Sequence, residues 1–236
     1  MDDAFVKLQL WRKTTGLILT GLLFVVIGIF LFAFVNGART AIDSMAGSIN
    51  NSLSVLTGVL GIFVVVFLLV VIVGFVLHIV GLSKFRKILD EEDGKAIGSV
   101  RNGLLLSLVV GFVVMLTAFL AGGFDLIPSA GKTLPAMLAG IGFVTVNITA
   151  YIMMLKGFNA LRRSQTFPAK ARRGASHLFV SMILNIIVVG LSFSANLIPD
   201  AEVVFGAIIL IAGLFGLILM FMGWAKIKNA DPNAIA

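Results

Sequence analysis

The stretch Leu56–Leu77 reads LTGVLGIFVVVFLLVVIVGFVL and contains 22 consecutive residues without a charged side chain. A helix needs about 20 predominantly apolar residues to cross the hydrocarbon core of a bilayer. A strand of a soluble sheet is much shorter, and a strand of a membrane barrel alternates apolar and polar residues. The stretch therefore predicts a transmembrane helix.

Five further stretches have the same character, and none of the six contains Lys, Arg, Asp or Glu. The six predicted spans are Gly16–Val35, Leu56–Leu77, Leu104–Gly122, Leu134–Leu155, Leu178–Leu197 and Val203–Met222. The first is longer than the apolar core of a signal peptide, so we expect it to be retained. Over the whole chain 59 % of residues are hydrophobic and only 12 % charged, with a mean hydropathy of +1.11. We predict an all-α integral membrane protein whose residues 1–236 form a single membrane domain.

The formal charge of +7 is distributed unevenly along the chain. On the predicted topology 16 of the 18 Lys and Arg residues border one side of the membrane, leaving only Arg39 and Lys132 on the other. Cytoplasmic loops carry such an excess, so both termini are expected in the cytoplasm. The absence of Cys excludes disulfides and thiolate metal sites. Together with the compact build, it also suggests the cytoplasmic membrane of a prokaryote.

A short motif recurs near the end of each even-numbered span: a Gly, an apolar residue directly after it, a second apolar residue at position +4 and a base at position +5. Its three copies begin at Gly81, Gly157 and Gly223. Each odd-numbered span begins with bases just before a Gly, and two of these glycines, Gly103 and Gly174, are 71 residues apart. Asp125-Leu126-Ile127-Pro128 and Asn196-Leu197-Ile198-Pro199 have the same offset. We predict three hairpins arranged as parallel repeats in a compact bundle, with repeat units of approximately 12–87, 101–163 and 172–229.

The connectors on the basic side carry two further patterns. Apolar residues at helical spacing, with bases between them, predict a short amphipathic interfacial helix after the second span, at Leu82–Leu89. The acidic run Asp90–Gly94 lacks the ligand pattern of a calcium loop and is expected to be a solvated turn. The bases predict a rim for lipid headgroups, formed by Lys84, Arg86, Lys87, Arg162, Arg163, Arg172 and Arg173.

The connector Lys156–Arg173 holds six bases and no acid. This composition has two interpretations: a docking site for an acidic partner or a phosphoinositide-like headgroup, and a simple orientation signal. Nucleic acid is not expected as a partner, because the aromatic residues of the connector are not interleaved with its bases as a stacking platform requires.

Two amides lie near the middle of the predicted slab, Asn147 on the fourth span and Asn185 on the fifth. One interpretation is a hydrogen bond that joins neighbouring helices. The other is a polar constriction, in which three hydroxyls would extend the stripe of the two amides along a path: Thr145 and Thr149 are four residues apart, as are Ser181 and Asn185. The candidate polar site is therefore Asn147, Asn185, Thr145, Thr149 and Ser181.

No catalytic motif, nucleotide loop or intramembrane carboxylate pair is present, so no enzyme, cofactor or metal site is expected. We expect a non-catalytic accessory, assembly or scaffold component that packs with membrane lipids, with a membrane-protein partner or with a second copy of itself. The alternative is a channel or facilitator for a small neutral or hydrophobic solute. We favour the first because a water-lined path usually has a more polar lining.

Overall fold

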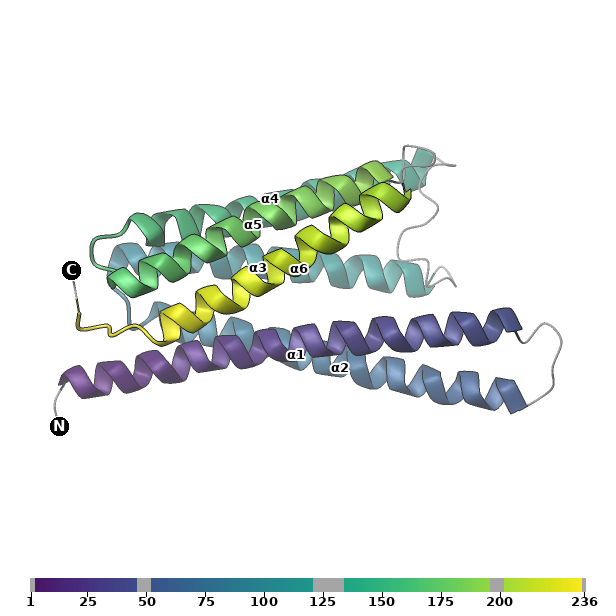
Figure 1. Ribbon diagram of the computed structural model, residues 1–236, viewed down its shortest axis with the longest axis horizontal. Coiled ribbons are helices and arrows are strands. Elements are labelled where there is room, and N and C mark those ends of the chain that lie inside the picture. Colours follow the sequence, from purple (N-terminus) through teal and green to yellow (C-terminus); the bar gives the residue numbers. More distant parts are fainter. Residues whose placement is uncertain (1–2, 46–51, 121–133, 196–201, 235–236) are drawn as a thin grey trace. The chain divides into compact units, whose positions relative to one another are not determined.

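The computed structural model describes residues 3–45, 52–120, 134–195 and 202–234, and every regular element in this part of the chain is an α-helix (Figure 1). The six helices are α1 (Asp3–Met45), α2 (Ser52–Arg86), α3 (Glu91–Leu120), α4 (Leu134–Arg163), α5 (Ala169–Ala195) and α6 (Glu202–Lys228). This confirms the prediction of an all-helical chain with six long helices.

Five described segments are long and apolar enough to cross a membrane: Asp3–Leu31, Val65–Arg86, Ile141–Arg163, Ala169–Ser194 and Val204–Lys228. They lie on α1, α2, α4, α5 and α6. The predicted third span, Leu104–Gly122, lies partly outside the described residues. The Leu-Ile-Pro elements of the predicted outer loops, at 125–130 and 196–201, lie outside them as well.

The chain forms two compact units. The described residues between positions 16 and 81 belong to α1 and α2 and form an antiparallel pair that we call the α1–α2 hairpin (Figure 1). Residues 1–15 and 82–236 form the second, which we call the four-helix unit because α3–α6 make up most of it.

The helices of the α1–α2 hairpin approach one another through glycines. A Cβ atom built on Gly21 would lie 2.5 Å from the backbone nitrogen of His78 and 2.6 Å from the backbone oxygen of Gly74. A Cβ on Gly81 would lie 2.9 Å from the backbone nitrogen of Ile18. Any larger side chain at these positions would have to displace backbone, so glycine permits this spacing between the helices.

In the four-helix unit α3 packs against α4, α4 against α5, and α5 against α6. Glycines again lie at the crossings: a Cβ on Gly157 would lie 2.5 Å from the backbone oxygen of Ala96, and one on Gly223 would lie 2.9 Å from that of Gly174. The amide of Asn233 donates to the backbone oxygen of Ala4 at 3.2 Å. This bond joins the two ends of the described chain at one end of the unit (Figure 1).

That end of the four-helix unit contains an aromatic cluster of five buried side chains, Trp11, Phe85, Phe158, Phe167 and Trp224. The ring of Trp11 lies 4.8 Å from that of Phe85 and 5.6 Å from that of Phe167, measured between centroids. The ring of Trp224 lies 6.4 Å from Phe85 and 6.1 Å from Phe158. The cluster therefore joins α1, the end of α2, the end of α4 with the connector that follows it, and the end of α6.

The recurrent Gly motif supplies much of this buried core. The two apolar positions of each copy are buried, and they are Leu82, Phe85, Phe158, Leu161, Trp224 and Ile227. The glycines aligned at the start of the odd spans do not have equivalent partners, however. Gly174 lies against Gly223, the glycine of the third motif copy, whereas Gly103 lies against Ala150 and not against Gly157 of the second copy. The repeat of three hairpins stays a prediction.

Two local predictions differ from the structure. The segment after the second span is not a separate helix, because residues 82–86 continue α2 and residues 87–89 form a turn. Leu82 and Phe85 are buried in the four-helix unit, so the apolar face of this segment has a protein environment. The acidic run is not a wholly solvated turn either, because Asp93 is only 3 % exposed.

Candidate functional site

Asn147 is buried at the boundary between α3 and α4. Its amide nitrogen donates to the backbone oxygen of Phe143 at 3.0 Å, and its side-chain oxygen accepts a hydrogen bond from the hydroxyl of Ser107 at 3.2 Å. An unbonded amide in an apolar environment costs several kcal/mol, and these bonds avoid that cost. Asn147 therefore joins two helices, and its partner on α3 is one that the sequence analysis did not identify.

On α5, Ser181 bonds to the neighbouring helix α6, whereas Asn185 bonds within α5. The amide nitrogen of Asn185 donates to the backbone oxygen of Ser181 at 3.0 Å. The hydroxyl of Ser181 is fully buried and donates to the backbone oxygen of Gly216 on α6 at 2.7 Å. A bond across α5 and α6 thus parallels the one across α3 and α4.

Thr145 and Thr149 lie on an exposed face of α4, whereas Asn147 is buried. Each threonine hydroxyl donates to the backbone oxygen four residues earlier, at 2.8 Å in both cases. Positions two residues apart on a helix point in nearly opposite directions, which is why the threonines and the amide do not share a face. The structure does not bring the five predicted polar residues together into one stripe.

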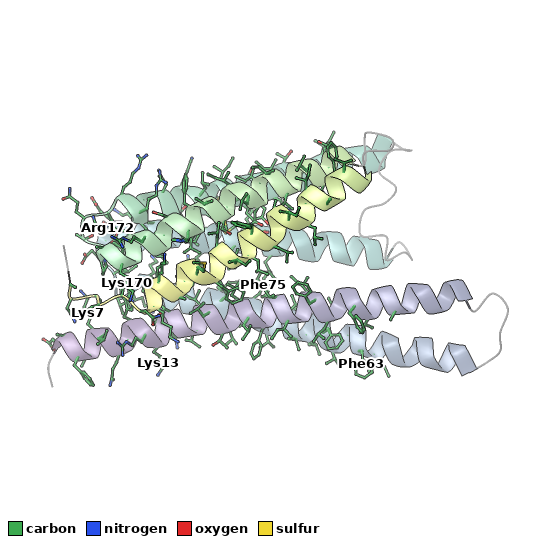
Figure 2. All side chains as sticks on the ribbon, viewed as in Figure 1. Lys7, Lys13, Phe63, Phe75, Lys170 and Arg172 are labelled. Carbon is green, nitrogen blue, oxygen red and sulfur yellow. The ribbon has the colours of Figure 1, made fainter. Side chains whose placement is uncertain are left out.

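The basic residues gather at the end of the four-helix unit that carries the termini, where Figure 2 shows Lys7, Lys13, Lys170 and Arg172. Of the seven residues of the predicted headgroup rim, five are exposed: Lys84, Arg86, Lys87, Arg163 and Arg173. The other two, Arg162 and Arg172, are half-buried and are held by contacts within the unit. The rim thus consists of five exposed bases and two that are held by contacts within the unit.

Arg162, in the last turn of α4, is the most firmly positioned of these bases. Its Nε donates to the side-chain oxygen of Asn159 at 2.9 Å, and its Cζ lies 4.0 Å from the centroid of the Phe179 ring on α5. Stacking of a guanidinium on an aromatic face is favourable, and more so when water is excluded. Neither partner was identified from the sequence, because this contact depends on how α4 and α5 pack.

A polar junction links the start of α3 to the connector between α4 and α5. The hydroxyl of Thr166 donates to Oδ2 of Asp93 at 3.0 Å and lies 3.0 Å from the hydroxyl of Ser164. The backbone nitrogen of Phe167 donates to the same Ser164 hydroxyl at 3.1 Å. Nη1 of Arg172 donates to the backbone oxygen of Ser164 at 3.3 Å. These bonds fix the connector on which Phe167 enters the aromatic cluster.

Burial raises the pKa of the Asp93 carboxyl above its ordinary value of 3.8. The hydrogen bonds from Ser164 and Thr166 act in the opposite direction, and the neighbouring carboxylates of Asp90 and Glu92 raise the pKa further. A nearly buried acid was not expected in an acidic run beside Gly, and no feature of that run distinguishes Asp93 from its exposed neighbours.

Comparisons with known protein families, with curated proteins and with solved structures found no match to this chain. Among the described residues, no three His, Asp or Glu side chains lie close enough together to hold a metal ion. The candidate sites are the paired polar groups of the spans and the positioned bases at one end of the four-helix unit.

Proposed function

We propose that the protein is a non-catalytic polytopic membrane protein that acts as an accessory, assembly or scaffold component and packs with lipids or with membrane-protein partners. The observation that carries this proposal is that polar side chains of the helices form hydrogen bonds to neighbouring helices of the same chain. The hydroxyls of Ser107 and Ser181 donate across helix pairs, to the side-chain oxygen of Asn147 and to the backbone oxygen of Gly216, so they support packing inside the chain. A solute path would require such groups to face a shared opening.

The outer faces of the helices support the same proposal. Apolar side chains of α6 are among the most exposed in the structure, with Leu210 at 63 %, Ile211 at 65 % and Phe215 at 61 %. The α1–α2 hairpin presents a similar surface, to which Ile62, Val65, Leu69, Val73 and Val76 contribute. Apolar surfaces of this extent are typical of contact with lipid or with another protein.

The topology forms part of the proposal. Three parallel hairpins would place both termini and the basic connectors in the cytoplasm, and the outer loops on the other side of the cytoplasmic membrane of a prokaryote. The bases at the end of the four-helix unit support this orientation. The natural chain contains no Cys, so single Cys residues can be labelled without background. Gln165→Cys and Asp231→Cys should react with a membrane-impermeant thiol reagent from the same side, and Ser48→Cys from the opposite side.

The functional test compares solute flux with helix association. Purified protein in liposomes should pass small neutral solutes no faster than protein-free liposomes do. Asn147→Leu should lower the stability of the protein in detergent, since Asn147 joins α3 and α4. The solute flux of this variant should equal that of the natural protein. Thr149→Val is the matched control, because it removes an exposed polar group from the same helix.

Flux that exceeds the protein-free rate and changes in a folded Asn147→Leu variant would instead establish the channel. Partner capture from native membranes would then identify what the scaffold holds, provided that flux is absent.

A further inference from the structure

The guanidinium of Arg162 lies beside an apolar helix segment, not beyond its end. Phe179, which it covers, is ten residues after the first residue of α5, or about 15 Å along the helix axis. Side chains of a helix lean toward its N-terminus, and α4 runs toward the basic end of the unit. The long side chain of Arg162 therefore extends back along α4, away from the exposed bases of the connector.

An anion would stabilise a cation in such a place. Arg162 is half-buried and has no carboxylate partner among the described residues. Its Nε is bonded to Asn159, whereas the two Nη amino groups make no hydrogen bond to the described part of the chain. A partly desolvated charge is costly unless it is paired. Two parallel N–H groups match the oxygens of a phosphate, to which arginine binds in a bidentate manner.

The surface next to this guanidinium is apolar and exposed. Val180, Ile183 and Ile187 follow Phe179 along α5, at spacings of three and four residues that place them on one side of the helix. Their side chains are 43 %, 38 % and 45 % exposed. This strip continues from the level of Arg162 toward the middle of the predicted span, and it suits an acyl chain.

The charge around the site favours a lipid with a net negative charge. The connector Lys156–Arg173 holds six bases and no acid, and Arg163, directly after Arg162, is exposed. Basic residues next to a membrane attract anionic lipids. A free phosphate would satisfy the guanidinium but would leave the apolar strip unused.

We propose that Arg162, held in place by Asn159 and Phe179, binds the phosphate of an anionic phospholipid whose acyl chain lies along Val180, Ile183 and Ile187. This inference rests on the proposed membrane location and deepens the proposed packing with lipids. It assigns the lipid contact to one positioned base and treats the exposed bases as a general electrostatic attraction.

The test measures lipid affinity of the purified full-length protein in detergent, by thermal shift during titration with phosphatidylglycerol or with phosphatidylcholine. The titrations are made in about 0.5 M salt, where exposed charges are largely screened and partly buried ones much less so. Arg162→Gln should weaken the affinity for phosphatidylglycerol about tenfold, because it removes a charge-assisted bidentate contact. Lys87→Gln, which removes one exposed charge from the same end, should change it less than about twofold at this salt concentration.

Two further variants distinguish specific binding by the positioned arginine from attraction by positive charge alone. Arg162→Lys keeps the charge but loses the planar fork, and Phe179→Leu removes the aromatic face while leaving the arginine, so each should weaken binding several-fold. If Arg162→Gln does not fold, these two variants still test whether Arg162 binds the lipid phosphate. Equal affinity of Arg162→Lys and the natural protein would overturn the proposal, because charge alone would then suffice.

Inorganic phosphate at millimolar concentration serves as the competing ligand. It should not displace phosphatidylglycerol. Displacement would overturn the proposal of a lipid ligand and would indicate a site for a free anion. Equal affinity for phosphatidylglycerol and phosphatidylcholine would overturn the anionic preference. Either result would leave the proposed scaffold standing if the liposomes show no solute flux, so the two proposals fail separately.

Discussion

In the α1–α2 hairpin the helices meet backbone to backbone, because Gly21 and Gly74 leave no side chain between them. At the basic end of the four-helix unit, large side chains fill the space instead, and Trp11, Phe85 and Trp224 interlock edge to face. In lipid, close packing at small residues replaces the hydrophobic driving force that water supplies. Aromatic clusters with directed hydrogen bonds add specificity where helix ends and connectors meet. The two regions therefore respond to different substitutions.

The largest expected effect is at Trp11. Its ring is buried against Phe85 and Phe167, and its Nε1 donates to the backbone oxygen of Ile227 at 2.7 Å. Trp11→Ala should lower the free energy of unfolding of the four-helix unit by about 3–5 kcal/mol. Chemical unfolding in detergent micelles, followed by circular dichroism, measures this loss. Trp11→Phe keeps much of the ring and should lose less, and equal losses in the two variants would contradict the packing argument.

In the α1–α2 hairpin the corresponding test adds a side chain at a glycine, where the Trp11 test removes one. Gly21→Ala places a methyl group 2.5 Å from the backbone nitrogen of His78, so the helices must separate, and we expect a loss of about 1–3 kcal/mol. Gly16→Ala is the matched control on the same helix, because nothing lies within 4 Å of its Cβ position. It should be neutral or stabilising by up to about 1 kcal/mol. The same unfolding measurement ranks the two variants, and a similar loss in both would show that helix spacing is not the cause.

Asp93 should make the four-helix unit sensitive to pH. Its folded-state pKa is raised, chiefly by burial, so the folded protein retains the proton to higher pH than the unfolded chain does. Stability should therefore fall as the pH rises from the ordinary value of 3.8 through the raised pKa. Asp93→Asn should remove this part of the pH dependence and, at pH 7, change stability by no more than about 1 kcal/mol. Unfolding curves of both proteins between pH 4 and 8 test this directly, and parallel pH profiles would contradict it.

The smallest expected effect is the bond between Ser107 and Asn147. Hydrogen bonds between membrane helices are worth about 0.6 kcal/mol on average, because the separated helices find other partners. A double-mutant cycle of Ser107→Ala and Asn147→Leu should give a coupling energy of that size. The pair Ser107→Ala and Thr149→Val should show no coupling, since Thr149 bonds to its own helix. Coupling above about 2 kcal/mol would indicate that this bond contributes more than ordinary helix association.

The apolar stretches predicted the helices well, because a run such as Leu56–Leu77 has few other stable structures. The boundaries on the basic side were less accurate: α2 continues to Arg86, and α3 begins at Glu91, well before the predicted span. The polar residues of the spans were found from their type, but their partners were not. Asn147 bonds to Ser107, 40 positions earlier, and no local pattern encodes that contact.

The amino-acid sequence is enough to predict that the chain is helical, that its helices are long and apolar enough for a membrane, and that bases gather near particular helix ends. These properties depend on composition and on short-range periodicity. The packing of the helices, by contrast, determines that Asp93 is buried while its acidic neighbours are exposed, and that Arg162 covers Phe179 while Arg163 does not. Each distinction lies between residues that are adjacent or nearly so. A rotation of about 100° per residue assigns them to different faces, and the packing of distant helices determines what each face meets.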